Sequence, residues 1–293
     1  MIAGGILKDF TSNAAVNKKE RVFTSSIRAL KIKNENQLHI LYSMNAILCS
    51  SVFSYYILNL GVSSGIEREE SEDAEIERVW YFDIPNILLK AREIEKHEAQ
   101  KYDLMKNMIK GLSVKEQCND IVLPQLKLNL EEKALLDYAN DIVIPVQMRH
   151  ENHEKHFQPL KLNDATLTDY ANLFIEHFKS SFVSVGKKFV VEIWHTEQII
   201  GMFFKVIPKS EYKKSIIWLN KQNDESGILQ KIAALGATEI TDKLFIQKDI
   251  RGFEKDSFYI FKPNEKRLWH KAIGYLDLYE ILDAILKAGK NKK

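Results

Sequence analysis

An uncharged stretch near the N-terminus constrains this chain more than any other feature of its sequence. Residues 37–66 contain no Asp, Glu, Lys or Arg, and about 20 apolar residues suffice for a helix to cross a bilayer. The stretch is nevertheless rich in serine, and four serines fall near one face at helical spacing: Ser43, Ser50, Ser51 and Ser54. A polar stripe of this kind is typical of a helix packed inside a soluble domain. We therefore expect one buried helix from Glu35 to Leu60 and no membrane partner.

The charges of the chain are spread unevenly, although their sum is close to zero. The 293 residues carry a formal net charge of +2, so binding to a polyanion would depend on where the cations lie. Residues 67–77 hold seven acidic residues and one cation, Arg68, whereas Lys and Arg outnumber Asp and Glu from Lys243 to Lys293. The C-terminal part is therefore the better candidate for contact with nucleic acid.

Two cysteines far apart in the sequence, Cys49 and Cys118, form neither a disulfide framework nor a zinc-binding pattern. No basic and then apolar N-terminal signal precedes them. We expect a cytoplasmic, reducing location, with both thiols in structural roles.

Shifts in the residue pattern predict three parts, 1–85, 86–119 and 120–293. The first holds a strand-like stretch, Val22–Ile32, before the uncharged helix. The second reads as one long charged helix, Asn86–Asn119, which we interpret as a connecting arm. Together with the third part they predict an α+β protein with a helical N-terminal segment, a helical arm and a C-terminal mixed α/β domain with antiparallel strands.

The third part is predicted in more detail from caps and periodicity. Asn129 can cap a helix over Leu130–Ile142 that Pro145 ends, and a second helix, Leu167–Phe182, would open at Asn163 or Thr166 and close at Gly186. Later segments alternate with period two or recover a helical period. We expect strands within Phe189–Ile207 with a turn at His195–Gln198, strands at Ser215–Leu219, Lys243–Ile250 and Ser257–Lys262, and helices at Gly227–Leu235 and Leu276–Leu286.

Three stretches in the same order resemble the C-terminal region of N6-adenine DNA methyltransferases of the restriction-modification and phage-defence type. The first combines Phe23–Leu30 with Leu48–Glu69, where Gly65, Ile66, Glu67 and Arg68 fill a turn of that family, and ends at Pro85. The second is Leu128–Pro145, and the third is Asp256–Leu286 with its Lys-Pro, its Trp and its Asp-containing last helix. The last helix departs from the family's usual pattern at Gly274–Leu278.

The resemblance implies a target-recognition portion without a methylating site. Methyltransferases of this class hold a flipped adenine with an Asn/Asp-Pro-Pro-Tyr/Phe motif and bind S-adenosylmethionine at a Gly-rich loop. Neither motif occurs here, and none of the six prolines is adjacent to another. We expect no cofactor in this chain, S-adenosylmethionine in a catalytic partner, and double-stranded DNA as the other partner. The chain would be a separate subunit, a split gene product or a fragment.

Two groups of residues are candidates for contact with DNA. The basic C-terminal stretch could neutralise phosphates and stack on a base, unless it is an ordinary solvated face with its Trp in the core. Its candidates are Arg251, Lys262, Lys266, Arg267, Trp269, His270 and Lys271. The resemblance adds a turn in which Arg68 would contact a guanine or a phosphate and Ser63, Ser64 and Gly65 would lie against the backbone. Arg68 could equally be neutralised within its own acidic run.

Other chemistries have weaker support. His150, His153 and His156 stand three apart, but a helix would rotate successive members of this series away from one another. Asp120, Glu131 and Lys133 follow the order of a nuclease metal site, but in a helical context. No catalytic motif is evident, and the alternatives to DNA binding are a protein–protein assembly module and an inactive fragment.

Overall fold

The chain folds into two compact units, Met1–His153 and Glu154–Lys293. The structure is a computed structural model and describes Ala14, Val16 and residues 30–61, 76–93, 114–183, 186–211, 214–219, 249–253 and 257–290. The fold is α+β, as the sequence predicts, with the described strands all in the second unit. The predicted boundaries after residues 85 and 119 fall within the first unit, to which 120–153 also belongs.

The uncharged stretch forms two helices where one was predicted. After a 3-10 turn, η1 (Glu35–Gln37), α1 (Leu38–Leu48) and α2 (Ser51–Leu60) meet at a 66° bend. Ser50 has extended backbone, and its hydroxyl donates to the carbonyl of Ile47 at 2.7 Å. A serine that bonds back to the preceding turn competes with continuation of a helix. The expectation of a single helix was therefore wrong.

The serines of this stretch are buried, as predicted for a helix inside a domain: Ser43, Ser50, Ser51 and Ser54. In the part of the chain that the structure describes, no single helix is long and apolar enough to span a membrane. Among these described residues, one bent pair, Glu35–Leu48 with Ser51–Leu60, passes such a test on length and composition.

Three uncharged side chains hold α2 against its neighbours in the first unit, and we call Ser51, Asn119 and Asn140 the amide centre. Asn119 lies on α5 (Val114–Leu126); its Oδ1 accepts the Ser51 N–H and its Nδ2 donates to the Ser51 hydroxyl, both at 2.8 Å. Asn140 donates to the Ser51 carbonyl at 3.1 Å. These bonds supply a partner for an N–H of the first turn of α2, which has none within the helix.

The predicted arm is helical in its described parts. Residues 87–93 are helical, and α5 contains Asn119 but continues to Leu126. Residues 94–113 lie outside the described residues. Whether the arm is one helix therefore stays a prediction.

The helix predicted at Leu130 begins there but does not end at Pro145. Asn129 caps α6 (Leu130–Tyr138) through a capping box with Glu132, with bonds of 2.8 and 2.9 Å. A π-helical turn, η2 (Ala139–Val143), then leads into α7 (Ile144–Gln147). The Ile144 N–H donates to the Ala139 carbonyl five residues back. This wider turn allows Pro145, which has no N–H to donate, to lie near the start of the next helix.

The second unit begins with a 3-10 turn, η3 (His153–His156), at the division between the units, and with α8 (Ala165–Val183). Asp164 caps α8 by accepting the Thr166 N–H at 2.9 Å, so the cap is neither Asn163 nor Thr166 as predicted. Gly186 follows with a φ of +69°, a conformation that suits glycine beyond a helix end. Gly186 lies three residues after the end of α8, and residues 184–185 lie outside the described residues, so its role in closing the helix stays a prediction.

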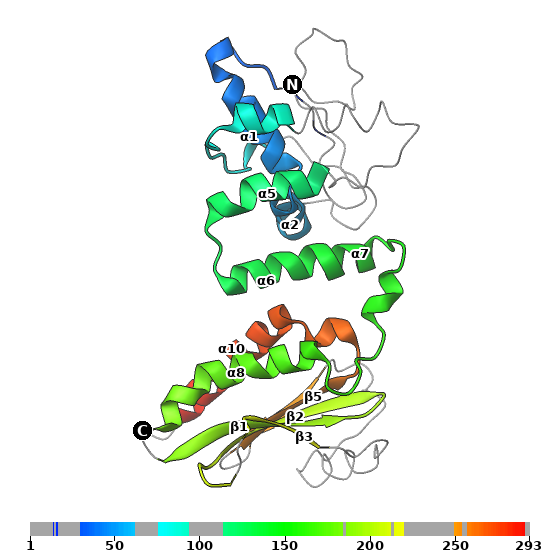
Figure 1. Cartoon of the computed structure of the whole chain (residues 1–293), viewed down its shortest axis with the longest axis vertical. Coiled ribbons are helices and arrows are strands. Elements are labelled where there is room, and N and C mark those ends of the chain that lie inside the picture. The colour runs from blue at the N-terminus through cyan, green and yellow to red at the C-terminus, as the bar shows by residue number, and fades with distance from the viewer. Residues whose placement is uncertain are drawn as a thin grey trace. The chain divides into compact units, whose positions relative to one another are not determined.

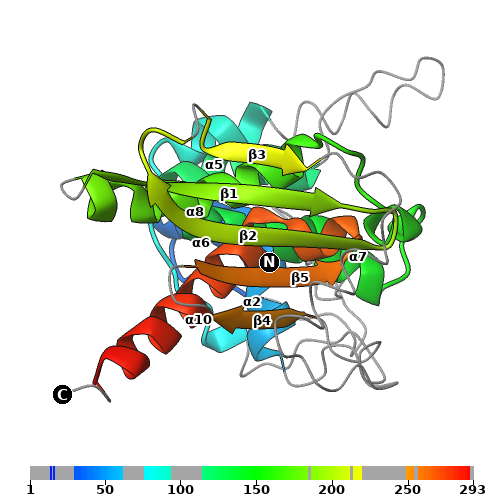
Figure 2. The same ribbon diagram turned by 90° about the horizontal axis from the view of Figure 1, so that it is seen from below.

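A five-stranded mixed sheet follows, in the order β3-β1-β2-β5-β4. The predicted hairpin is confirmed as β1 (Lys187–His195) and β2 (Ile199–Pro208), antiparallel with Ile193 opposite Met202. β5 (Ser257–Pro263) pairs antiparallel with β2 and with β4 (Ile250–Phe253), whereas β3 (Ile216–Leu219) runs parallel to β1. Figure 2 shows the order of the strands face-on. Gly227–Leu235 and nearly all of Lys243–Ile250 and Val22–Ile32 lie outside the described residues.

Two helices cover one face of this sheet. α8 and α10 (Lys271–Lys290) pack beside each other on it, with the 3-10 turn η5 (Lys266–Trp269) before α10 (Figure 1). α10 begins five residues before the predicted Leu276. Alternate strand residues such as Val191, Met202 and Ile260 point into the core beneath the helices, together with Phe174 and Trp269.

The other face of the sheet carries an aromatic cluster of Phe203, Tyr259 and Phe261. Two glycines lie directly opposite these rings in the register, Gly201 across from Phe261 and Gly252 across from Tyr259. A Cβ at Gly201 would lie 2.3 Å from a carbon of the Phe261 ring, and one at Gly252 would lie 2.1 Å from the Tyr259 oxygen. Each glycine therefore leaves room for the aromatic side chain across the strand.

Candidate nucleic-acid interface

The turn between β5 and α10, residues 263–271, holds most of the predicted DNA-contacting residues on a fixed frame. Asn264 is buried and exchanges bonds with both backbone groups of Leu160, accepting at 2.8 Å and donating at 3.1 Å, and it donates to the Thr196 carbonyl at 2.8 Å. The Lys266 N–H donates to the Gln158 carbonyl at 3.1 Å. These hydrogen bonds connect the turn to the segment that precedes α8 and to the β1–β2 hairpin.

Trp269 belongs to the core of the second unit. Its side chain has no exposed surface, lies edge-on to Tyr170 with ring centres 5.1 Å apart, and donates from Nε1 to the Pro263 carbonyl at 3.0 Å. A ring that is fully enclosed offers no face to a base. The stacking role predicted for Trp269 is therefore corrected to a structural one.

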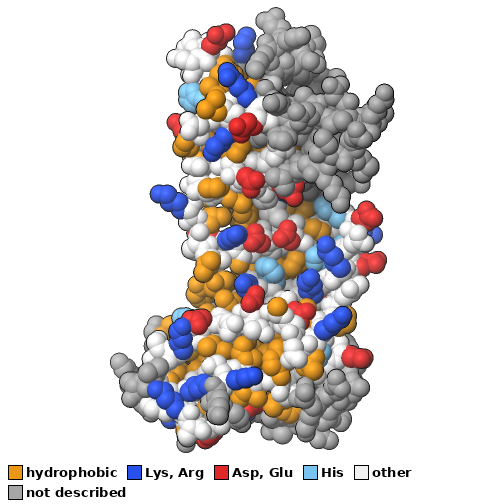
Figure 3. All heavy atoms as spheres, in the orientation of Figure 1, with side chains coloured by type: hydrophobic (Ala, Val, Ile, Leu, Met, Phe, Trp, Pro, Cys, Tyr) orange, Lys and Arg blue, Asp and Glu red, His pale blue; other side chains and the backbone are white. Residues whose placement is uncertain are grey.

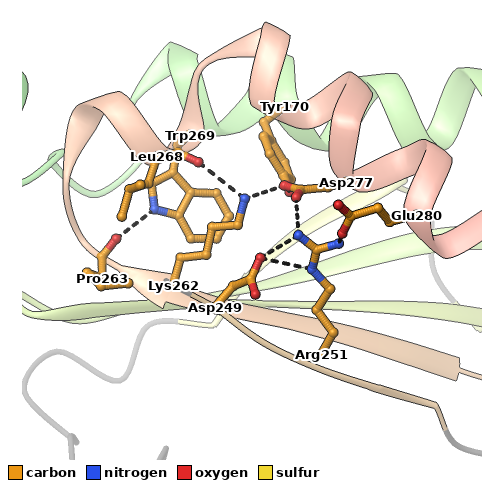
Figure 4. A network of polar contacts seen from close by, with 9 residues as sticks. All are labelled: Tyr170, Asp249, Arg251, Lys262, Pro263, Leu268, Trp269, Asp277 and Glu280. Atoms are coloured by element: carbon orange, nitrogen blue, oxygen red, sulfur yellow. Dashed lines mark hydrogen bonds and ion pairs between the residues drawn. The ribbon is translucent and has the colours of Figure 1, made fainter. Parts of the chain in front are cut away.

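Arg251 and Lys262 are paired with carboxylates inside the second unit. Together with Tyr170 and Asp277 they form a group that we call the charged centre. Figure 4 shows Asp277 of α10 between Lys262 of β5 and Arg251 of β4, with Tyr170 of α8 reaching the same carboxylate. Lys262 and Asp277 are each 3% exposed as side chains, and the Arg251 Nη2 lies 2.6 Å from the Asp277 Oδ1. Lys262 also lies over the rings of Tyr170 and Trp269, 5.3 and 5.6 Å from their centres.

Arg251 has two further carboxylate partners. Its Nε donates to Asp249 at 2.9 Å, and its Nη1 pairs with Glu280. The two cations are thus matched by three carboxylates, so this region presents no excess positive charge to a phosphate. The predicted phosphate contacts of Arg251 and Lys262 are corrected for that reason.

Burial and neighbouring charges shift the pKa values of these groups in different directions. Burial lowers the pKa of Lys262, although Asp277 opposes the shift. Burial raises the pKa of Tyr170 well above its usual value, and the Asp277 charge adds to this effect. Burial also disfavours the charged form of Arg251, but Asp277, Asp249 and Glu280 outweigh it and raise its pKa. The centre holds its charges because they are paired.

The other predicted residues of the turn remain at the surface, with local partners. Lys266 is exposed. Arg267 donates to Glu265 at 2.7 Å and lies over the ring of Phe157, 4.4 Å from its centre, while Lys271 lies 3.1 Å from Asp169. The His270 Nδ1 accepts the Ala272 N–H at 3.2 Å at the start of α10. The turn therefore presents three cations, Lys266, Arg267 and Lys271, two of which have a carboxylate nearby.

The N-terminal candidates cannot be placed. Ser63, Ser64, Gly65 and Arg68 lie outside the described residues, and their contact with DNA stays a prediction.

The alternative chemistries find no assembled site among the residues described. In residues 114–183 and the other described ranges, no group of three or more His, Cys, Asp or Glu side chains is placed to hold a metal ion. His153 Nδ1 bonds to the His150 carbonyl at 2.9 Å, and His156 is buried. Asp120 lies on α5, and Glu131 and Lys133 lie on α6. The helical context expected for these three residues is therefore confirmed.

The two cysteines lie together, which their separation in the sequence did not suggest. Both are buried and neither is in a disulfide, and the thiol of Cys118 interacts with the thiol of Cys49. That contact, together with burial, raises the pKa of Cys118. Thiols kept protonated in this way are poor nucleophiles.

Comparison with known proteins found no matching family model, no matching curated protein and no matching solved structure.

Proposed function

We propose that the chain is a non-catalytic DNA-binding specificity portion of an N6-adenine DNA methyltransferase, acting in the cytoplasm with a catalytic part supplied elsewhere. The observation that carries the proposal is the group of surface cations Lys266, Arg267 and Lys271 on a turn fixed by buried Asn264 and Trp269. Cations on a rigid frame lose little freedom on binding and can be set to the spacing of phosphates.

The turn offers more than side-chain charge. It opens α10, a helix of 20 residues, whose N-terminus carries the positive end of the helix dipole. A phosphate beside Lys266 and Lys271 would be favoured by both the ammonium groups and this dipole. Contacts of this kind position a protein on a duplex, whereas base contacts provide sequence specificity. We assign the base contacts to Arg68 and its turn, on the basis of the resemblance in sequence.

The methylation step belongs to the partner in this proposal. The catalytic part would bind S-adenosylmethionine and the flipped adenine, while this chain would hold the flanking duplex.

A second candidate function, a protein–protein assembly module, is favoured by exposed apolar side chains in the first unit. Leu60, Leu89 and Leu130 are 66%, 60% and 80% exposed. They come from separate elements, however, and single exposed leucines are common on protein surfaces. An apolar interface would also differ from phosphate binding in being insensitive to salt.

The test is binding of the purified chain to a fluorescent duplex across a salt series. We expect the triple variant Lys266→Ala, Arg267→Ala, Lys271→Ala to bind more weakly. The slope of log K against log salt should become shallower by about 0.9 for each phosphate that the variant no longer neutralises. The matched control is Lys31→Ala, Lys33→Ala, Lys133→Ala, which removes three exposed lysines of the first unit.

Two results would contradict the proposal. One is no binding to any duplex at low salt. The other is a turn variant that binds as tightly as the control variant, with the same salt slope.

A further inference from the structure

A second group of cations lies where β1 and β3 begin and β2 ends, and we call Lys187, Lys188, Lys209 and Lys214 the sheet-end lysines. In the register Lys187 is opposite Pro208 and Lys188 is opposite Ile207. The Lys209 N–H donates to the Gly186 carbonyl at 3.3 Å, and Lys214 immediately precedes Ser215, whose carbonyl accepts the Val191 N–H at 2.8 Å. Three neighbouring chain segments therefore bring these lysines to one end of the sheet.

Three of these lysines differ from Arg267 and Lys271 of the turn in having no carboxylate partner among the described side chains. Lys187, Lys209 and Lys214 are exposed. Among the side chains that the structure describes, no Asp or Glu lies within ion-pair distance of them, whereas Arg267 and Lys271 each have one. In Figure 3, Lys and Arg side chains gather toward the lower left, where β1 begins in Figure 1. Like charges held on adjacent strands repel one another, and a polyanion would relieve that repulsion.

The sheet-end lysines and the turn lie at opposite ends of the same strands. β5 ends at Pro263, which is opposite Ile199 at the start of β2, whereas Lys187 is opposite Pro208 at the end of β2 (Figure 2). From Ile199 to Pro208 a strand that rises about 3.3 Å per residue covers roughly 30 Å. One turn of duplex DNA advances about 34 Å. The two ends of β2, beside which the two groups of cations lie, are therefore separated by nearly the repeat of a duplex.

We propose that the sheet-end lysines bind the phosphate backbone of duplex DNA about one helical turn away from the backbone contact made by the turn at residues 263–271. This inference rests on the proposed function, because it names a second contact on the same partner. Each strand of the duplex carries a phosphate about every 3.4 Å along its axis. A rigid sheet with cations at both ends then lies along one side of the duplex. The residues at the ends of the β-strands contact phosphates and not bases.

The test compares three variants of the full chain on duplexes of about 8, 12, 16 and 24 base pairs, with circular dichroism to confirm folding. The sheet-end variant is Lys187→Ala, Lys209→Ala, Lys214→Ala, and the other two are the turn variant and the control variant described above. We expect the wild type to bind more tightly as the duplex grows past about 10–12 base pairs, the length of one turn. The sheet-end variant should not show this increase, and its salt slope should be shallower by about 2–3.

The outcomes separate this inference from the proposed function. If only the turn variant binds weakly, the inference is overturned and the proposed function stands. If only the sheet-end variant binds weakly, the turn makes no contact with DNA, and both the role given to the turn and the inference of two contacts one helical turn apart are overturned. If the wild type binds no duplex at low salt, both are overturned. Binding to anionic phosphatidylserine vesicles but not to DNA, abolished in the sheet-end variant, would also overturn the inference.

Discussion

The two units bury polar groups in opposite ways. The second unit encloses full charges in the charged centre, where Lys262 and Asp277 meet in the core. The amide centre of the first unit holds only neutral groups, where the half-buried Asn119 bonds to the backbone and hydroxyl of buried Ser51. Neutral groups need a hydrogen bond each, whereas a buried charge needs an opposite charge from another element. A basic residue in the sequence therefore indicates surface charge only when it is not paired with a buried carboxylate.

The largest effect expected from this comparison is that of Asp277→Ala. The change leaves Lys262 buried without its anion and removes a partner from Arg251 and Tyr170. Breaking a buried ion pair on one side costs about 3–5 kcal/mol, so we expect a loss of that size in the free energy of unfolding, measured by urea denaturation. The control is Asp283→Ala, which removes an exposed carboxylate from the same helix. If the free energy of unfolding fell by less than about 1 kcal/mol, the ion pairs of Asp277 would not stabilise this unit as a buried charge pair should.

A smaller effect is expected in the amide centre. Asn119→Ala removes two hydrogen bonds and leaves the Ser51 N–H without its side-chain partner. An unsatisfied buried donor costs about 1–3 kcal/mol, less than an unpaired charge. The same denaturation experiment measures it, with exposed Asn36→Ala as control. If Asn119→Ala cost as much as Asp277→Ala, the contrast between the two centres would fail.

At neutral pH Tyr170→Phe should cost about 1.5–3 kcal/mol, because the lost hydrogen bond is to a charged carboxylate, and this variant should also change the response to alkali. The pKa of Tyr170 is raised in the folded protein, so the folded state keeps a proton that the unfolded state releases above about pH 10. That contribution to stability is complete below about pH 10 and declines as the pH rises further. Unfolding free energies at about pH 9–11 should therefore fall more steeply in the wild type than in Tyr170→Phe. Equal slopes would contradict a raised pKa.

Local signals predicted local structure well. Alternation located the β1–β2 hairpin, and the Asn129 capping signal located the start of α6, because each depends on residues close in sequence. The break at Ser50 and the passage through Pro145 were missed because short-range bonds rearrange there: a serine hydroxyl ends one helix, and a π-helical turn allows another to continue.

The candidate site was less predictable for a different reason. Lys262 and Arg251 look like surface cations in the sequence, and only the packing of α10 against the sheet brings Asp277 to them. Trp269 was expected either at the surface or in the core, and in the structure it lies in the core. Lys187 and Lys188 at the start of a strand were a visible signal for the sheet-end lysines, but the distance of Lys187, Lys209 and Lys214 from the described carboxylates depends on tertiary packing that no local pattern records.

The two glycines that lie opposite aromatic residues of β5 limit how this sequence can evolve. Gly201 lies against Phe261 and Gly252 against Tyr259, so neither glycine can acquire a side chain while its ring remains where it is. A larger residue at position 201 becomes acceptable only after position 261 has become smaller, and the same order applies to 252 and 259. Each pair should therefore behave as one inherited unit, with glycine and aromatic residue exchanged together or retained together.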